Sequence, residues 1–319
     1  MPISALLNTL LAKTEVTYKT DPVPTGAANA ILLADDASLT PIEPEFDERN
    51  NSKGYFGHNQ TLVASVKRKL SFSVEIAGGG TPLATVPAYG PLLRACGMGQ
   101  TVVAVTSVTY APITAAASME SLTQYFNIGD KKYIMVGSRG NVKWKYTAGK
   151  IPRMMFDFTG LLPASNAVTD DTSYGGALTL TAWKQPQIVN FANTPAFSVH
   201  GFGTSELYSM EIDLGNMVTY RNKPNAEDVT IVGRKPTVTL SIGEPTLAQK
   251  NFYTNQIGAV LDVLSITHGV GAGNVIGHGG PKFQIESVDL GAEDNVRVLN
   301  IKGRLLPNAG NDDLSMICT

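Results

Sequence analysis

An internal repeat constrains the fold more than any other feature of this sequence. Residues 66–76 (VKRKLSFSVEI) return 166 positions later as residues 232–242 (VGRKPTVTLSI), with an identical Arg-Lys pair in both copies. Apolar side chains occupy alternate positions after that pair, which is the pattern of a half-buried strand. We therefore expect these alternating residues to fill two cores: Phe72, Val74, Ile76, Val238, Leu240 and Ile242.

A second pair of segments matches further along the chain. Residues 156–163 resemble residues 299–307 once Arg304 is treated as a one-residue insertion. Without the insertion the strand phases would disagree, because a one-residue slip moves every side chain to the other face. Each copy also predicts a short helix between its first and last strands, at 82–96 and 246–257. Proteins with two similar units often form rings in which a doubled subunit replaces two single ones.

The repeat, the turn residues and the length together predict the domain organisation. A chain of 319 residues is long enough for two domains with separate cores. Its many Gly, Pro, Thr and Val residues favour a mainly β fold, here two tandem β-sandwich or barrel units that each carry a short flanking α-helix. The predicted segments are an N-terminal arm (1–45), a first unit (46–163), a connecting segment (164–204), a second unit (205–307) and a C-terminal tail (308–319).

The charge of the chain limits its partners. The net charge of −2 gives no electrostatic footprint for tight binding to nucleic acid or to a membrane surface. Only 16% of residues are charged, against about 25% in typical soluble proteins, and this favours a chain that hides surface against copies of itself. Two cysteines, no secretory signal and no apolar run of bilayer length predict a protein of a reducing compartment.

Polar stretches and turn residues predict several hairpins and loops. An acidic run at 43–48 begins a long exposed hairpin, and residues 211–225 form its counterpart in the second unit. A hard-cation site is the alternative for the acidic run, although a solvated arm explains it more simply. Three further segments are predicted as a hairpin at 133–146 with its turn at 137–141, a strand at 177–183, and a mobile glycine-rich loop at 269–280.

Residues with catalytic or ligand-binding chemistry are few and scattered. None of the four histidines has metal-ligand spacing, and His268 and His278 are interpreted as loop histidines. The glycine-rich loop between them lacks the Lys-Ser/Thr pair of a nucleotide-binding loop. Cys96 is interpreted as a small buried hydrophobe rather than a nucleophile. The sequence therefore predicts no enzyme, no catalytic residue, no cofactor and no metal.

A basic and aromatic stretch leaves two interpretations. Lys143, Lys145 and Lys150 lie near Trp144 and Tyr146, a combination that can bind nucleic acid through stacking. An ordinary strand with lysines outward and aromatic side chains inward explains the same alternation.

Further segments share the strand-and-turn pattern of a known family. They are residues 14–22, 136–142, 148–152, 156–161, 210–216 and 231–236, together with Arg221. In these segments the chain resembles the major tail tube proteins of long-tailed (siphovirus-type) bacteriophages. The shared motifs are patterns of strands and turns, and none of them is a catalytic fingerprint. The chain departs from many relatives in length, because it contains two units where they have one.

The resemblance implies a fold and a function. The fold is a β-sandwich with a flanking helix, in which one sheet joins those of its neighbours into a barrel around a lumen. The function is structural: rings stack into a hollow tail tube that conducts DNA into the host, and the absence of a basic excess suits a conduit that must not hold phosphate. Implied partners are copies of the chain, as trimeric rings with pseudo-six-fold symmetry, the tape measure protein, and the tail terminator and tip proteins, with no membrane. The location is the virion, assembled in the host cytoplasm.

The surfaces outside the repeated strands are the predicted ring-to-ring contacts. These surfaces are residues 1–62 and the tail after Pro307. The charged candidates are Glu43, Glu45, Asp47, Glu48, Arg49, Lys53, Arg221 and Lys223. Two alternative functions remain: another tail ring component of the same fold, such as a distal-tail or secretion-tube-like protein, and a carbohydrate-binding adhesin.

Overall fold

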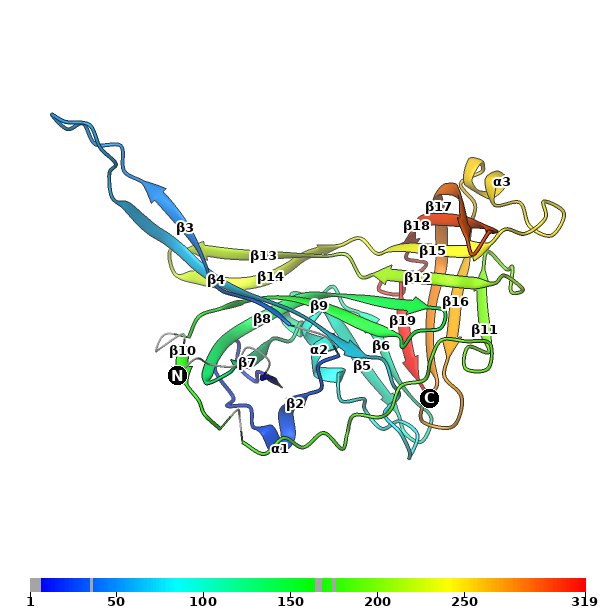
Figure 1. Cartoon of the computed structure of the whole chain (residues 1–319), viewed down its shortest axis with the longest axis horizontal. Coiled ribbons are helices and arrows are strands. Elements are labelled where there is room, and N and C mark those ends of the chain that lie inside the picture. The colour runs from blue at the N-terminus through cyan, green and yellow to red at the C-terminus, as the bar shows by residue number, and fades with distance from the viewer. Residues whose placement is uncertain (1–6, 35–36, 164–167, 174–175) are drawn as a thin grey trace.

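The computed structural model describes residues 7–34, 37–163, 168–173 and 176–319. The remaining parts of the predicted arm (1–6, 35–36) and of the connecting segment (164–167, 174–175) lie outside the described residues. The fold is mainly β, as predicted, with short helices between the strands (Figure 1). The helices are α1 (Gly26–Asn29), α2 (Gly90–Ala95), α3 (Phe252–Ile257) and a 3₁₀ turn at Ala116–Ser118.

Eight strands form one continuous sheet that runs through both halves of the chain. Their order is β3-β4-β9-β8-β12-β15-β18-β17, antiparallel throughout. The first half supplies β3 (Ser38–Glu48), β4 (Thr61–Glu75), β9 (Arg153–Leu161) and β8 (Lys131–Thr147). The second half supplies β12 (Leu207–Asp213), β15 (Thr237–Gly243), β18 (Val296–Leu306) and β17 (Ile276–Glu293). The two halves meet where β8 pairs with β12.

Shorter strands cover the apolar face of this sheet. In the first half β7 (Leu122–Ile128) pairs with β8 and with β1 (Asn8–Thr14), which also pairs with β2 (Ala30–Ile31). In the second half β16 (Leu261–His268) joins β17 to β11 (Ala196–Val199). The hairpin of β5 (Met98–Val103) and β6 (Ser107–Pro112) connects to β17 through β19 (Ser315–Cys318). Strand β10 (Val168–Asp170) pairs with the start of β8.

Two long hairpins extend from the sheet in the same direction (Figure 1). One is formed by the outer parts of β3 and β4. The other is β13 (Asn216–Lys223) with β14 (Ala226–Arg234), which continues the hairpin of β12 and β15. Helix α3 lies at the opposite end of the molecule from the tip of the β3–β4 hairpin (Figure 1). Both exposed hairpins expected from the polar stretches are therefore present.

The strand ladders repeat with the sequence. Phe72 of β4 lies opposite Phe156 of β9, and its repeat partner Val238 of β15 lies opposite Gly303 of β18. The β15–β18 ladder is continuous as far as Arg304, so the predicted insertion at that residue is wrong. Because Phe72 and Val238 are repeat partners, the residues opposite them, Phe156 and Gly303, correspond to each other. Gly303 lies four positions beyond residue 299, which the sequence predicts as the counterpart of Phe156. An even displacement keeps the same side chains facing the core, which is why the alternation alone could not reveal it.

The predicted core residues are buried. All six alternating residues of the repeat are at most 4% exposed, but they belong to one continuous core, so the expectation of two separate cores is wrong. Phe72 stacks against Phe156 and Phe158, with ring centroids 5.6 and 5.9 Å apart. The aromatic side chains of β8 also point inward, because Trp144 and Tyr146 are fully buried while Lys145 is exposed. An ordinary sheet thus accounts for that basic and aromatic stretch, as the simpler interpretation predicted.

Both chain ends differ from the prediction. The arm was expected to be irregular, but β1 pairs along its whole length with β7 and buries Leu10 and Leu11. The tail was expected to be free for ring-to-ring contacts, but β19 pairs with both β17 and β6. Leu314 and Met316 are fully buried in consequence. Short apolar runs near a terminus gain more by completing a core than by staying in solvent.

Several local predictions also fail. The hairpin expected at 133–146 is a single bent strand, β8, whose irregularity lies at Gly137–Ser138, and its true hairpin partner is β7. No strand forms among the described residues of 177–183. The glycine-rich loop is shorter than predicted, because β17 begins at Ile276. Both predicted helices are present only in their last turns, as α2 and α3.

Candidate assembly surfaces

The polar face of the eight-stranded sheet is concave and carries side chains of both charges. An open groove of about 1070 Å³ crosses it. The polar lining residues of the groove include Ser71, Ser73, Lys143, Lys145, Lys150, Arg153, Asp157, Ser209 and Glu211. These residues come from β4, β8, β9, β12 and, for Lys150, the turn between β8 and β9, so the groove spans the junction between the two halves.

Acidic residues accompany the basic residues of this face. At the junction, the Lys143 ammonium lies 3.1 Å from Asp213 and 3.8 Å from Glu211. The hydrogen bond to Asp213 raises the pKa of Lys143. On the second half, Arg304 pairs with Glu286. Lys145 and Lys150 of the groove have no ion-pair partner among the described residues, so neighbouring carboxylates neutralise only part of the positive charge on this face.

The sheet ends in two strand edges that pair with no other strand in the described part of the chain. One edge belongs to β3, which pairs only with β4. The other is the second half of β17, from Ser287 to Glu293, which pairs only with β18. Leu290 on this edge is 63% exposed. An exposed strand edge is a template for pairing with another chain.

The ladders identify the internal counterparts of these edges. The repeat aligns β4 with β15, and the paired residues on the next strands then align β9 with β18 and β8 with β17. By this alignment, Ser287 and Val288 of β17 correspond to Lys143 and Trp144 of β8. In the same way, Ser38 of β3 corresponds to Asp213 of β12. Strands β8 and β12 pair with each other inside the chain. The open part of β17 is thus the counterpart of β8, whereas the counterpart of β12 is the segment that ends at Ser38, the first residue of β3.

The predicted contact residues lie on the two hairpins, and three of them are already paired there. Glu43 lies 2.9 Å from Lys69, and Glu45 lies 3.0 Å from Lys67. The hydrogen bond from Lys67 lowers the pKa of Glu45.

On the second hairpin the Arg221 guanidinium contacts Asp228 at 2.6 Å. These ion pairs within each hairpin stiffen the arms. They leave fewer charges than expected for contacts with another ring.

The remaining predicted contact residues are exposed. They are Asp47, Glu48, Arg49, Lys53 and Lys223. The Lys53 ammonium lies 5.8 Å from the centre of the Tyr55 ring. Tyr55 and its neighbour Phe56 are 73% and 105% exposed at the tip of the hairpin. Sequence reasoning missed this aromatic pair because it stands in a polar stretch, although two adjacent aromatics in an exposed loop are themselves a signal of binding.

The structure brings the two hairpins together at their bases. The Lys67 ammonium of β4 lies 5.6 Å from the centre of the Tyr220 ring of β13. The β13–β14 hairpin also rests on the first half of the chain: the Arg139 guanidinium donates to the Val229 carbonyl at 2.9 Å, and Lys19 pairs with Glu227. The predicted ring-to-ring role of these loops stays a prediction.

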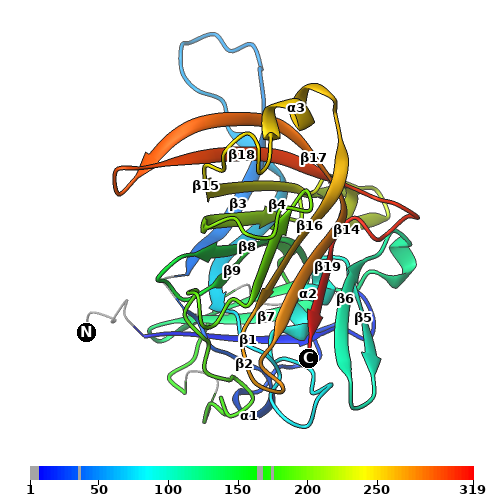
Figure 2. The ribbon, with the colours of Figure 1, turned by 90° about the vertical axis from the view of Figure 1, so that its right-hand side faces the viewer.

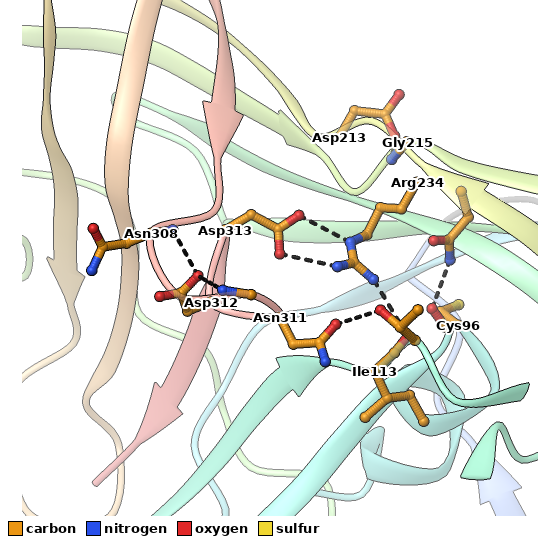
Figure 3. A network of polar contacts seen from close by, with 12 residues as sticks. Cys96, Ile113, Asp213, Gly215, Arg234, Asn308, Asn311, Asp312 and Asp313 are labelled. Atoms are coloured by element: carbon orange, nitrogen blue, oxygen red, sulfur yellow. Dashed lines mark hydrogen bonds and ion pairs between the residues drawn. The ribbon is translucent and has the colours of Figure 1, made fainter. Parts of the chain in front are cut away.

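The repeated arginine holds the base of each hairpin. Arg68 is fully buried and donates to the carbonyls of Pro41 and Ile134. Arg234 pairs with Asp313 through two hydrogen bonds of 3.0 and 3.1 Å (Figure 3). It also lies 3.4 Å from the Ile113 carbonyl (Figure 3). Asp313 precedes β19, so this ion pair ties the C-terminal segment to the second hairpin.

Three of the four histidines (His200, His268 and His278) and Cys96 are buried, whereas His58 is exposed. The prediction of loop histidines is wrong for His268 and His278, which are 2% and 3% exposed and stand in β16 and β17. Cys96 is fully buried, as predicted, and burial raises the pKa of its thiol well above the ordinary value. No group of three or more His, Cys, Asp or Glu residues that could hold a metal occurs in the described part of the chain.

No known protein family and no curated protein matches the chain. Within the described residues, no helix has both the length and the apolar character needed to cross a membrane.

Proposed function

We propose that this chain is the major tail tube protein of a long-tailed bacteriophage and that it acts as a mechanical conduit, not as an enzyme. The observation that carries the proposal is the eight-stranded sheet, in which two similar groups of four strands are joined at β8–β12 and end in open edges. The open part of β17 is the counterpart of β8, and the counterpart of β12 ends at Ser38, where β3 begins. The same pairing can therefore be repeated between chains until the sheet closes.

The internal junction sets the register of this closure. Lys143 lies opposite Asp213, and Trp144 lies opposite Ile212. In the counterpart pairing, Ser287 of one chain lies opposite Ser38 of the next. Closure removes both exposed edges.

Three chains with two groups of strands each supply six similar modules to a ring. The polar sheet face then lines the lumen, where its mixture of acidic and basic side chains limits the attraction for the phosphate backbone of passing DNA. Stacked rings form the tube, in contact with a tape measure protein inside and with terminator and tip proteins at the ends. The virion is the proposed location, after assembly in the host cytoplasm.

Electron microscopy of the purified protein tests this function. We expect hollow tubes whose cross-sections show six similar lobes built from three chains. Symmetry analysis and mass per length determine the number of chains. Six whole chains per ring would contradict the trimer, and the absence of any tube at high protein concentration would contradict the conduit.

Stacking of the rings is proposed to use the hairpin tips. Asp47 and Glu48 lie outside the ion pairs within the hairpin, so reversing both to lysine should leave closed rings that form few tubes. The neutral variant Asp47→Asn with Glu48→Gln keeps the shape and is the matched control, with a smaller expected loss. Negative-stain images count rings and tubes. An unchanged tube yield for the reversed variant would place the stacking surface elsewhere.

Two alternatives predict different images. A distal-tail or secretion-tube-like protein would form rings that cap or terminate instead of long tubes. A carbohydrate-binding adhesin is favoured only by the exposed Tyr55–Phe56 pair. It predicts binding to glycans without rings.

A further inference from the structure

The β13–β14 hairpin is seated on the first half of its own chain by a well-defined apolar contact. Val229 and Ile231 on one face of this hairpin are 0% and 8% exposed. The Cδ1 of Ile231 lies 3.2 Å from the position that a Cβ on Gly97 would take, just after α2. Beside it, the Asn216 amide donates to the Cys96 carbonyl at 2.6 Å. The end of α2 is therefore a seat for this hairpin.

The β3–β4 hairpin carries the same apolar face without a partner in the described part of the chain. In the β3–β4 hairpin, Pro44 pairs with Val66 and Phe46 pairs with Val63. At the corresponding places of β13–β14, Val218 pairs with Ile231 and Tyr220 pairs with Val229. Phe46 and Val63 are each 57% exposed, although Val229 is fully buried. The hairpin therefore presents an apolar face that only an external partner can cover.

The second half of the chain has the matching seat, and it is empty. Helix α3 follows β15 as α2 follows β4, and each helix is followed by a residue with positive φ, Gly97 at 73° and Ala259 at 47°. Around Ala259 the apolar side chains are exposed. Their exposed fractions are 87% for Ile257, 39% for Val260, 45% for Leu261 and 46% for Val263.

The basic residue of the first seat has a counterpart here too. By the alignment of the two halves through their strand pairs, Lys282 of β17 corresponds to Arg139 of β8. Arg139 donates to the backbone of the seated β13–β14 hairpin. Lys282 is half-buried beside the empty seat. It can donate in the same way to a second hairpin.

We propose that the β3–β4 hairpin of one chain docks on the α3–β16 surface of a second copy, with Val66 over Ala259, as β13–β14 docks on α2 within the chain. The occupant is a second copy because α3 and the β3–β4 hairpin lie at opposite ends of one molecule (Figure 1). In the end-on view α3 lies on the near side and the hairpin rises behind β17 and β18 (Figure 2). The inference rests on the proposed ring and specifies its lateral contact. The base of the hairpin thus holds neighbours within a ring, and only its tip reaches beyond.

An engineered disulfide tests the contact. The variant Val66→Cys with Ala259→Cys, oxidised in the assembled state, should give covalent dimers and trimers on non-reducing gels. A mixture of the two single variants should give dimers only. The native Cys96 and Cys318 are 0% and 4% exposed, so they give little background. The pair Gly97→Cys with Ile231→Cys is the internal reference, because its disulfide forms within one chain.

A substitution provides the second measurement. Val63→Asp places a charge in the proposed contact and should raise the protein concentration needed for ring formation at least tenfold. Val105→Asp is the matched control, because Val105 is 75% exposed on the β5–β6 turn. Its assembly should equal that of the wild type.

The outcomes separate this inference from the proposed function. Tubes that form normally under the microscope but give no cross-link at 66–259 would overturn the docking and leave the tube intact. A protein that forms neither tubes nor cross-links would overturn both. Cross-linked trimers without tubes would support the docking and contradict the stacked conduit.

Discussion

At the scale of single residues, the contacts of its side chain explain why the same arginine stands in both copies of the repeat. Arg68 and Arg234 are the same residue of the repeat; Arg68 donates to backbone carbonyls and Arg234 to the Asp313 carboxylate. Burial lowers the pKa of Arg68 to about 10, so it stays charged at neutral pH. A buried charge held by such contacts favours one arrangement of the neighbouring strands, because losing a partner leaves a desolvated charge.

His278 makes stability depend on pH. Its ring packs on Trp144 at 5.3 Å and Tyr146 at 5.6 Å, and neither ring nitrogen has a hydrogen-bond partner among the described residues. Burial, with a smaller effect of nearby His268, lowers the pKa of His278 to about 3. An unfolded histidine has a pKa of about 6.5. Below that pH the unfolded state therefore binds a proton that the folded state refuses.

The predicted consequence is a loss of stability as the pH falls from about 6.5 towards about 3, of roughly 1.4 kcal/mol for each pH unit. His278→Leu removes this contribution, so its free energy of unfolding should depend less on pH. At pH 7.5 the variant should be as stable as the wild type or more so, because an unsatisfied polar group is replaced. Urea unfolding at several pH values measures both. Equal pH slopes for the two proteins would show that His278 is not the titrating group.

At the scale of elements, β19 is a structural strand and not an assembly arm. It fills the space between β17 of the second half and β6 of the first, and it carries Met316 and Cys318 into the core. The Tyr89 hydroxyl lies 3.7 Å from the Cys318 sulfur, which places the chain end against α2 of the first half. The C-terminal segment therefore holds the two halves together.

Deletion of residues 308–319 should destabilise the subunit instead of leaving a folded, non-assembling one. Met316→Ala is the milder change, with an expected cost of about 2–5 kcal/mol for a buried methionine. Thr114→Ala is a control at an exposed site near the same segment. Circular dichroism and urea midpoints measure the effects. A deletion variant that unfolds at the wild-type midpoint would show that β19 adds no stability.

At the scale of the whole molecule, the two halves form one continuous surface with unsatisfied ends. The junction at β8–β12 and the seat of β13–β14 on α2 show how one half contacts the next. The edges of β3 and β17 and the surface of α3 lack those contacts. A chain with one satisfied and one unsatisfied copy of the same interface associates head to tail, and a closed ring is the arrangement that satisfies every copy.

The sequence by itself determined the mainly β fold and the faces of the residues in the repeated strands. Alternation at 71–76 and 237–242 is a local property, because a strand exposes successive side chains to opposite faces whatever its partners are. The two polar hairpins were predictable for the same reason. A segment rich in polar and charged residues is expected to stay exposed to solvent whatever the rest of the chain does.

Tertiary structure alone decided how the strands pair. The four-position displacement at Gly303, the single bent strand at 131–147 and the burial of His278 all depend on contacts between distant segments. So do the strands at the two chain ends and the pairing of Glu45 with Lys67. An alternating pattern of apolar residues is unchanged by a shift of the strand register by an even number of residues. A short apolar run has the same sequence pattern in a loop and in a strand. Only the competition of distant segments for the same core selects between them.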